Sequence, residues 1–369
     1  MKNRSLKIAV GMSGGVDSSL AASLLVEAGH EVTGVYLDCW GLPGCGVDEN
    51  RKDAMRVGLK LGIPMKVLDL KKKYQEKVMD WFFEEVKAGR TPNPDVLCNK
   101  EIKFGMFLDW AISEGFEKIA TGHFARQKPM HLGGQARLLQ AKDKHKDQTY
   151  FLAMLKPEQL EKVLFPIGGM TKKEVRKEAK KRGLHVFDKK STSGICFIGH
   201  KISFEELLKT RIKEHEGEVV NLKNKVIGRH KGYEFYTVGQ RHGFEVVVKT
   251  SESKPLFVVS KDKKKNRLVV GEKKELFRDS FEVEKWSFIG KKFEVTNLEF
   301  LVRIRHGGKL VKCVVEPCIP ARGETLRVSL KERVFGVAPG QVAVLYKKTV
   351  GTVPTVFECL GGGVIGGGR

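Results

Sequence analysis

The sequence contains no long hydrophobic run. None of its stretches approaches the roughly 18 consecutive apolar residues that a membrane-spanning helix requires. The residues Met1–Ser5 lead directly into a short apolar run and a glycine-rich loop, so we expect no signal peptide. No low-complexity tract occurs apart from the glycines near the C-terminus. We therefore expect a cytoplasmic protein with no membrane partner.

Cysteine is scarce, and its spacing does not suggest a disulfide framework. The 7 cysteines are an odd number and lack the dense arrangement of small secreted domains. Cys313 and Cys318 have four residues between them, but no second pair has the spacing of a zinc site. These patterns predict reduced thiols and no structural metal.

Acidic residues are in the minority. The chain has 44 Asp and Glu against 67 Lys and Arg, which gives a formal net charge of +23. A surface this basic attracts polyanions over a Debye length. Nucleic acid is therefore the leading class of partner, although charge does not indicate which nucleic acid.

Strand-like and helix-like segments alternate over the first part of the chain. Buried-strand patterns occur at 6–10, 31–37, 65–70 and 118–121, and helical periodicity at 18–28, 48–61, 72–88 and 102–114. This alternation predicts an α/β domain with a parallel sheet covered by helices on both faces. At 369 residues, the chain is also long enough for two or three domains.

The helical periodicity stops at about residue 200. Short β-rich runs follow at Tyr233–Val238 and Leu256–Val259, separated by turns and lysine-rich stretches. From Phe281 the predicted strands are longer, at 301–305, 311–316, 325–330 and 342–346, as in a small β-barrel. We predict an N-terminal domain at 1–202, a small, mostly β central domain at 203–278 and a C-terminal barrel at 279–369.

A glycine-rich loop, Gly11–Ser19, joins the first predicted strand to the first helix. Ligands bind at such strand ends in parallel sheets. Gly14 and Gly15 let backbone amides approach phosphate oxygens, and the helix N-terminus adds donors and the positive end of its dipole. Asp17 would repel bare phosphate unless a cation or amides balance it, which suggests Mg²⁺ bound with a nucleotide. No Walker lysine follows the loop.

Two cysteine segments stand out. In Gly89–Lys100, two prolines fix a loop, and we expect a helix to begin near Cys98 and lower the pKa of its thiol. Asp95 lies three residues earlier, within reach as an acid or base if the chain turns. Cys196 lies between glycines in Ser193–Gly199. Taken singly, either cysteine is more often a core residue.

Together these segments resemble one family, the bacterial tRNA-specific 2-thiouridylases (the MnmA/TrmU group), within the ATP pyrophosphatase or PP-loop superfamily. The resemblance rests on the Ser-Gly-Gly-x-Asp-Ser loop and on segments that span most of the chain. These further segments are Ala120–His123, Lys146–Leu152, Gly194–Gly199, Gly239–Arg241 and Cys359–Gly363.

The resemblance implies roles by position. It implies that Cys98 is the nucleophile, that Cys196 carries the transferred sulfur as a persulfide, and that Asp95 is an acid-base group. The implied ATP contacts are Gly11, Met12, Ser13, Gly14, Gly15, Val16, Asp17, Ser18, Leu37 and Gly122. The implied tRNA contacts are Asn93, Pro94, Asp95, Lys146, Asp147, Gln148, Arg305 and His306.

The chain departs from the family pattern in three places, one of which is His242, where the family commonly has Lys after Gly-Gln-Arg. Ser191-Thr192-Ser193 stands where the family usually has Asp-Ser-Thr, so a carboxylate near Cys196 is missing. Arg305-His306-Gly307 stands where the family usually has Arg-Tyr-Arg. Two weaker features leave alternatives open: His123 either lines the nucleotide site or packs in the core, and the lysines after the capping box Thr171–Glu174 suit a solvated face better than an RNA contact.

The resemblance implies an ATP-dependent 2-thiolation of the wobble uridine, U34, of tRNA. ATP and Mg²⁺ would be required, AMP and pyrophosphate would be released, and the partners would be tRNA and a persulfide donor such as a cysteine desulfurase or relay protein. We expect a monomer when the protein is free. An iron–sulfur cluster on Cys98, Cys196 and Asp95 is a less favoured alternative to the persulfide. The rival functions are an amidating ATP pyrophosphatase and a non-catalytic RNA-binding protein.

Overall fold

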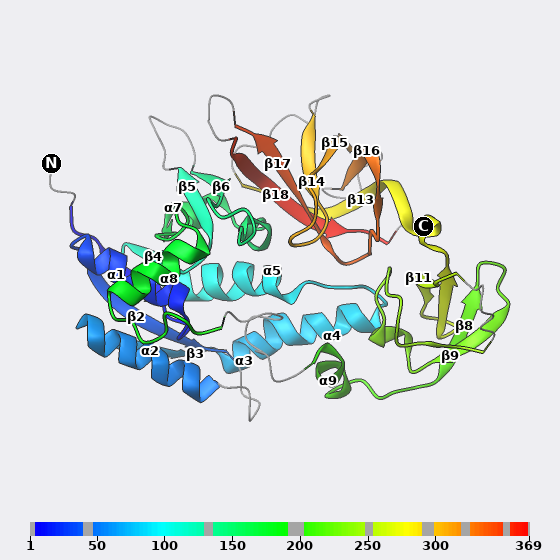
Figure 1. Ribbon diagram of the computed structural model, residues 1–369, viewed down its shortest axis with the longest axis horizontal. Helices are drawn as coiled ribbons and strands as arrows, with labels where there is room; N and C mark the ends of the chain where they lie inside the picture. The colour runs from blue at the N-terminus through cyan, green and yellow to red at the C-terminus, as the bar shows by residue number, and fades with distance from the viewer. Residues whose placement is uncertain are drawn as a thin grey trace.

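The computed structural model describes residues 4–39, 47–128, 136–190, 203–247, 254–289, 299–318, 325–349 and 355–367. The molecule is elongated, with an α/β part and a small β part at opposite ends and a β-barrel beside the helices that run between them (Figure 1). Among the described residues, none of the helices combines the length and the apolar character needed to cross a membrane.

The α/β part is built on a parallel sheet with strand order β3-β2-β1-β4-β7. Alternate residues of β1 enter two different cores: Ile8 and Val10 pack with helix α1, whereas Ala9 packs with Phe104 on the other face. The predicted parallel sheet covered on both faces is confirmed. The strands are β1 (Lys7–Gly11), β2 (Glu31–Asp38), β3 (Met65–Asp69), β4 (Lys118–Ala120) and β7 (Val163–Leu164).

The helices predicted at 18–28, 48–61 and 72–88 begin and end close to those positions, whereas the helix predicted at 102–114 is the latter part of a helical run that begins at Pro94. Helix α1 follows the glycine loop, and α8 contacts it after the Thr171 cap. The helical run at 71–87 is interrupted by a π-helical segment, η1. The bounds are α1 (Val16–Glu27), α2 (Val47–Leu61), α3 (Lys71–Tyr74), η1 (Gln75–Met79), α4 (Asp80–Lys87), α5 (Pro94–Cys98), η2 (Asn99–Met106), α6 (Phe107–Ser113), η3 (Thr149–Leu152), α7 (Pro157–Glu161) and α8 (Lys172–Lys181).

The central part is a small sheet with strand order β10-β9-β8-β12-β11, preceded by helix α9 (Phe204–Lys209). The strand predicted at Tyr233–Val238 is wrong, because Tyr233–Phe235 forms the 3₁₀ turn η4. Its aromatic side chains are buried against α4, so the apolar residues reflect packing of a turn, not strand alternation. The strands are β8 (Gly217–Asn221), β9 (Val226–His230), β10 (Glu245–Val246), β11 (Phe257–Asp262) and β12 (Arg267–Gly271).

The C-terminal part is a closed barrel, as predicted. Its strand order β13-β16-β15-β14-β17-β18 is closed by antiparallel pairing of β13 with β18. A hairpin from much earlier in the chain, β5 (Ala125–Lys128) and β6 (Arg137–Gln140), extends this sheet through β18. The remaining elements are η5 (Lys273–Leu276), β13 (Phe277–Phe288), β14 (Phe300–Arg303), β15 (Val311–Pro317), β16 (Leu326–Phe335), β17 (Val342–Lys348) and β18 (Phe357–Ile365).

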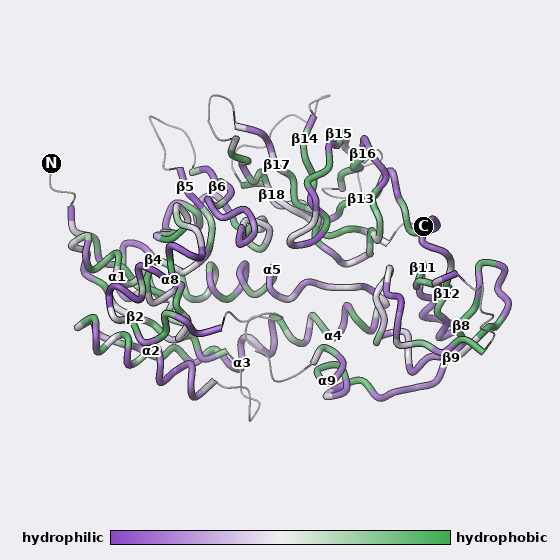
Figure 2. Tube along the Cα trace, viewed as in Figure 1, coloured by the Kyte–Doolittle hydropathy of each residue, from purple (hydrophilic) through white to green (hydrophobic). Residues whose placement is uncertain are grey.

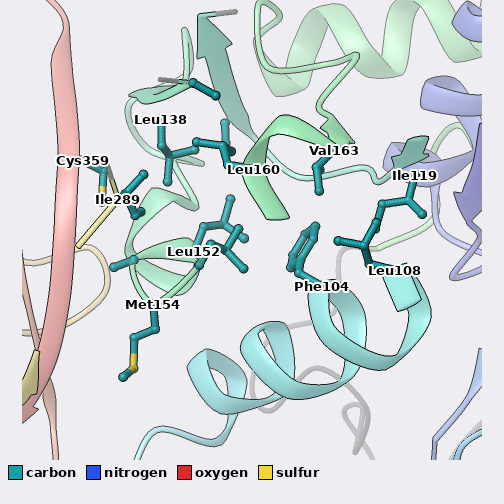
Figure 3. Close-up of a cluster of buried hydrophobic side chains, with 14 of the residues drawn as sticks. Phe104, Leu108, Ile119, Leu138, Leu152, Met154, Leu160, Val163, Ile289 and Cys359 are labelled. Carbon is teal, nitrogen blue, oxygen red and sulfur yellow. The ribbon is translucent and has the colours of Figure 1, made fainter. Parts of the chain in front are cut away.

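One apolar core joins the barrel to the α/β part. It runs from Ile119 and Leu108 beside the parallel sheet, through Leu152, to Ile289 and Cys359 of the barrel (Figure 3). Hydrophobic stretches (green) alternate with hydrophilic ones (purple) along the helices and strands of all three parts (Figure 2). The barrel and the α/β part are therefore packed as one unit.

Leu138 tests this shared core. Its side chain is fully buried, and its position pairs with Cys359 of β18, so Leu138→Ala should leave a cavity that costs about 2–5 kcal/mol of unfolding free energy. Leu139→Ala, which changes the opposite and partly exposed face of the same strand, is the control. Urea denaturation followed by tryptophan fluorescence measures both. An equal, small effect of the two substitutions would contradict the shared core.

Candidate functional site

The glycine loop lies at the carboxyl edge of the parallel sheet, between β1 and α1. Gly14 has a φ of 72°, and a Cβ there would lie 2.1 Å from the Asn50 carbonyl oxygen, so glycine is required. The Ser13 amide donates to Ser18 Oγ at 3.1 Å, and Ser19 Oγ donates to the Gly15 carbonyl at 2.8 Å. These hydrogen bonds hold the shape of the loop, and the buried side chains of Met12 and Val16 anchor it in the core.

Gly122 closes one side of the loop. It follows β4, which lies next to β1, and a Cβ on it would lie 2.4 Å from the Ser18 amide nitrogen. Leu37 lies near the end of β2, on the other side of β1. The structure thus brings three of the sequence-predicted ATP-binding segments to one edge of the sheet, as the strand order requires.

Asp17 is balanced by an ammonium group. Lys172 Nζ, at the first position of α8, donates to both Asp17 carboxylate oxygens at 2.6 and 2.7 Å. Burial raises the pKa of Asp17, and the Lys172 charge opposes that rise. Lys172 thus supplies the balancing charge from within the chain, where we expected a divalent cation or backbone amides. The capping box that starts α8 at Lys172 is confirmed, but it gave no indication that this lysine contacts Asp17.

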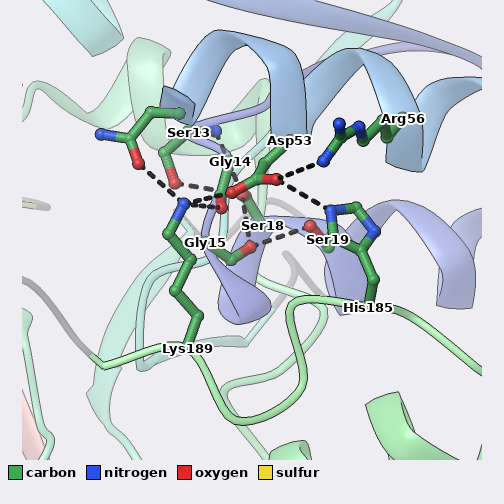
Figure 4. A network of polar contacts seen from close by, with 10 residues as sticks. Ser13, Gly14, Gly15, Ser18, Ser19, Asp53, Arg56, His185 and Lys189 are labelled. Atoms are coloured by element: carbon green, nitrogen blue, oxygen red, sulfur yellow. Dashed lines mark hydrogen bonds and ion pairs between the residues drawn. The ribbon is translucent and has the colours of Figure 1, made fainter. Parts of the chain in front are cut away.

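A second lysine, Lys189, also holds the loop. Lys189 Nζ donates to the Gly14 carbonyl at 3.2 Å and to Asn50 Oδ1 at 2.9 Å, and it also pairs with Asp53 (Figure 4). His185 Nε2 contacts the same Asp53 carboxylate at 3.0 Å. Partial burial works against ionisation of Asp53, but the bonds from Lys189 and His185 prevail and lower its pKa. Sequence patterns gave no signal for this network.

Cys98 and Asp95 lie on one short helix. Helix α5 begins at Pro94, where Asn93 Oδ1 accepts from the amides of Asp95 and Val96 at 3.2 and 3.3 Å. The expected helix start near Cys98 is therefore wrong, since Pro at the first helical position and an Asn cap place it a turn earlier. The thiol lies a full turn from the helix N-terminus and is 1% exposed. The three-residue spacing puts Asp95 and Cys98 on the same side of the helix.

Several other predicted residues fall outside the described residues. These are Cys196, its neighbours Gly194–Gly199 and the Ser191–Ser193 departure from the family pattern. The juxtaposition of Cys98 with Cys196 thus stays a prediction, as does the iron–sulfur alternative that would need both.

The predicted RNA contacts differ in their surroundings. Lys146 and Arg305 are exposed, and the His306 ring packs on Phe151 with ring centroids 4.4 Å apart. The Gln148 amide oxygen accepts from the Phe124 amide at 2.8 Å. Asn93 and Pro94 lie at the start of α5, next to Asp95.

Asp147 does not suit a direct contact with RNA. Its carboxylate is 1% exposed, pairs with Arg303 Nη1 at 3.2 Å and accepts from the Ala141 amide and the Thr149 hydroxyl. The buried carboxylate already accepts hydrogen bonds from within the protein, and through Arg303 it joins the α/β part to the barrel. The Asp147 side chain is therefore unavailable to RNA, and a tRNA contact at this position, through the backbone, stays a prediction.

His123 is a packed residue. Its ring lies between Phe104 and Phe165, and Nδ1 is 2.8 Å from the Thr121 hydroxyl. Burial lowers the pKa of His123 well below its usual range, and Lys103 adds to the effect, so the ring is neutral at pH 7. Within the described ranges, no group of three or more His, Cys, Asp or Glu residues is arranged to hold a metal ion.

Comparison with known proteins decides the family. Three family models match in series: "tRNA methyl transferase HUP domain" at residues 6–200, "tRNA methyl transferase PRC-barrel domain" at 205–272 and "Aminomethyltransferase beta-barrel domain" at 278–365. The tRNA-specific 2-thiouridylase MnmA of Pediococcus pentosaceus is 40% identical over 98% of this chain and 96% of its own length. The chain belongs to the tRNA-specific 2-thiouridylase MnmA family. The MnmA protein of Listeria monocytogenes is 40% identical over 98% of this chain and 95% of its own length. That of Staphylococcus aureus is 38% identical over 99% of this chain and 96% of its own length.

The solved structures that match this MnmA family member are more distant from it. A 4-thiouridine synthetase–RNA complex with bound ATP is 19% identical, with a TM-score of 0.37 over 53% of this chain and 46% of that chain. NMN synthetase from Francisella tularensis is 15% identical, with a TM-score of 0.34 over 55% of this chain and 71% of that chain. Values this low carry no inference about activity.

The Asp17–Lys172 pair can be tested through stability. Lys172→Met should cost about 1–2 kcal/mol at pH 7, less than the 3–5 kcal/mol of a fully buried pair, because the Asp17 side chain is 31% exposed. Without Lys172, the pKa of Asp17 in the folded state rises further. A carboxyl whose folded pKa is raised destabilises the protein only above its unfolded pKa, so the deficit should shrink as the pH falls.

Urea denaturation at several pH values from about 5 to 8 measures this dependence. Lys173→Met is the matched control, since Lys173 is the adjacent lysine on the exposed side of α8. If the loss of unfolding free energy in Lys172→Met stays constant with pH, or if Lys173→Met shows the same loss, the Asp17–Lys172 ion pair does not stabilise the loop.

Proposed function

We propose that this chain converts the 2-oxo group of uridine 34 in tRNA to a 2-thio group, using ATP and a persulfide. The observation that carries the proposal is the loop Gly11–Ser18, held in a phosphate-binding shape at the strand edge, in a chain whose MnmA relatives are named for tRNA 2-thiouridylation. The relatives match nearly the full length, so each part of the chain has a counterpart in them.

The glycine loop would hold the phosphates of ATP. Backbone amides near Gly14 and Gly15 and the N-terminus of α1 supply donors and positive potential, and Lys172 and Lys189 add positive charge on two sides. Mg²⁺ in proteins binds through one or two carboxylates and substrate phosphates, so any ion here would arrive with ATP beside Asp17. Asp17 would have to exchange part of its bond to Lys172 for such an ion.

The chemistry needs activation because an oxygen on C2 of uridine is a poor leaving group. In the proposed first step, the C2 oxygen attacks the α-phosphate of ATP, and the bond to pyrophosphate breaks. The terminal sulfur of a persulfide on Cys196 then bonds to C2, and AMP leaves. The Cys98 thiolate attacks the Cys196 sulfur, which frees the 2-thiouridine and forms a Cys98–Cys196 disulfide that an external thiol reduces. Asp95, one turn away on α5, would move a proton near the base.

RNA binding fits the charge and the layout of the protein. The net charge of +23 favours contact with phosphates, and exposed Lys146 and Arg305 lie beside the junction of barrel and catalytic part. A base must leave its stack to reach a buried thiol, which is easiest in a single-stranded anticodon loop. We further propose that residues 1–202 carry the ATP chemistry, that 203–278 and 279–369 contact the RNA, and that the protein acts in the cytoplasm as a monomer with a persulfide-carrying donor.

The products of ATP test the loop. Incubation with substrate tRNA and a persulfide donor should yield AMP and pyrophosphate, because the loop lacks the lysine of a Walker motif. Chromatography of the spent nucleotide and mass spectrometry of digested tRNA measure both products. Reactions without RNA identify an amidating activity on a small molecule. ADP as the main product, or AMP without 2-thiouridine, would refute the proposed reaction.

The two cysteines should separate by role. Cys98→Ser should still accept a persulfide sulfur at Cys196 and then stall, because the thiol that releases the product is gone, whereas Cys196→Ser should accept none. Cys318→Ser, at a partly exposed barrel position, should behave as the unaltered protein. Thiol-labelling mass spectrometry locates the added sulfur. Sulfur on Cys98 would show that the roles of the two cysteines are reversed. If the anaerobically purified protein is coloured, contains iron and uses free sulfide, the iron–sulfur cluster is favoured over the persulfide.

A further inference from the structure

A turn of the barrel reaches the loop that leads into helix α5. The Thr91 amide donates to the Pro339 carbonyl at 2.7 Å, although Pro339 lies in the barrel, far later in the chain. Gly340 approaches so closely that a Cβ on it would lie 2.8 Å from both Arg90 Cβ and the Thr91 amide nitrogen. The barrel segment 338–342 thus contacts the backbone just before the Asn93 cap.

The same barrel segment also bonds to Tyr150, a second residue that supports α5. The Tyr150 hydroxyl donates to the Val342 carbonyl at 2.8 Å, and the Tyr150 side chain is fully buried. Asn93 faces this hydroxyl, and the Asn93 side chain caps α5. Asp147 and Arg303 fix the turn η3 that carries Tyr150, through the Thr149 hydroxyl. Two routes therefore lead from the barrel to the first turn of α5.

Helix α5 itself lies between two cores. Val96 belongs to the core shared with the barrel, whereas Cys98 belongs to the core shared with α4 and the central sheet. Helix α5 is the first part of a helical run that continues through η2 and α6, and because helix ends fray, the position of its first turn depends on these neighbours. A displacement of about 1 Å at reacting groups can cost on the order of a hundredfold in rate.

We infer that the barrel segment 338–342 is a positioning device for the thiolation site, which sets the place of Asp95 and Cys98 by holding Thr91 and Tyr150. This inference rests on the proposed function for its effect on turnover, but the position of Cys98 can be measured without any reaction. The barrel then does more than bind RNA: the geometry of the nucleophile's helix depends on how the barrel is seated.

Two glycines of the same turn provide a matched pair of variants. Gly340 and Gly336 both have positive φ, 90° and 72°, so alanine strains the backbone at either position. A Cβ at Gly340 would press on Arg90 and Thr91, whereas a Cβ at Gly336 would meet nothing within 4 Å. The difference between Gly340→Ala and Gly336→Ala therefore isolates the contact with the loop before α5.

The first readout is the rate at which iodoacetamide alkylates Cys98, followed by peptide mass spectrometry on the full chain. Cys98 is 1% exposed, so displacement of α5 should speed its alkylation at least fivefold in Gly340→Ala and leave Gly336→Ala near the unaltered protein. Cys313, fully buried within the barrel, is the internal reference for general loosening. An unchanged Cys98 rate, or equal acceleration of Cys98 and Cys313, would overturn the inference.

The second readout is turnover. Gly340→Ala should lower kcat for 2-thiouridine formation about tenfold, with KM for tRNA and ATP within about twofold, because positioning and not binding is changed. Equal kcat values for the two glycine variants would overturn the inference. If the unaltered protein forms no 2-thiouridine, the proposed function fails, and the alkylation readout still decides the inference.

Tyr150→Phe covers the case in which Gly340→Ala does not fold. It removes the hydroxyl that bonds to Val342 and keeps the packed ring, so Cys98 alkylation should rise and kcat should fall in the same sense. Tyr236→Phe is its control, since the Tyr236 hydroxyl makes the same kind of bond, to the Gly243 carbonyl, within the central part. Indistinguishable behaviour of the two tyrosine variants would count against the device.

Discussion

The arrangement of the barrel on the α/β part depends on one constraint: the buried carboxylate of Asp147 needs hydrogen bonds and an opposite charge. A carboxylate with 1% exposure is tolerated only when hydrogen bonds and an opposite charge replace water. Here these come from Arg303 of the barrel, from the Ala141 amide after the hairpin and from Thr149 of η3. The segment that carries Ala141, Asp147 and Thr149 must therefore meet Arg303 of β14, which is 156 positions away from Asp147, and this contact fixes where the barrel lies on the α/β part.

Sequence patterns predicted what local periodicity and glycine geometry determine. The parallel sheet, the loop Gly11–Ser18 and the closed barrel all follow from alternation and turn residues near them in the chain. The loop is recognisable because Gly14 and Gly122 have no room for a Cβ. The start of α5 could also have been placed from sequence, since Asn93 followed by Pro94 is a cap followed by a first-turn proline.

What sequence could not supply are contacts between distant segments. Lys172 and Asp17 are 155 positions apart, and periodicity on α8 gives no indication of the partner. The burial of Asp147 depends on Arg303, which a local pattern places on a strand without showing what it faces. The prediction of a strand at Tyr233–Val238 is wrong for the same reason. The side chains of Tyr233 and Phe235 are apolar because they are buried against α4, and not because they alternate along a strand.

The hairpin β5–β6 has a consequence for biosynthesis. Its partner, β18, lies more than 200 residues later and among the last residues of the chain. Protein synthesis proceeds from the N-terminus, and segments fold as they emerge, so the β6 edge of this hairpin has no strand partner until β18 has been made. The sheet that joins the hairpin to the barrel therefore forms only once β18 is available. A chain truncated before β18 would keep an uncovered strand edge, the kind of surface that chaperones bind and on which aggregates form.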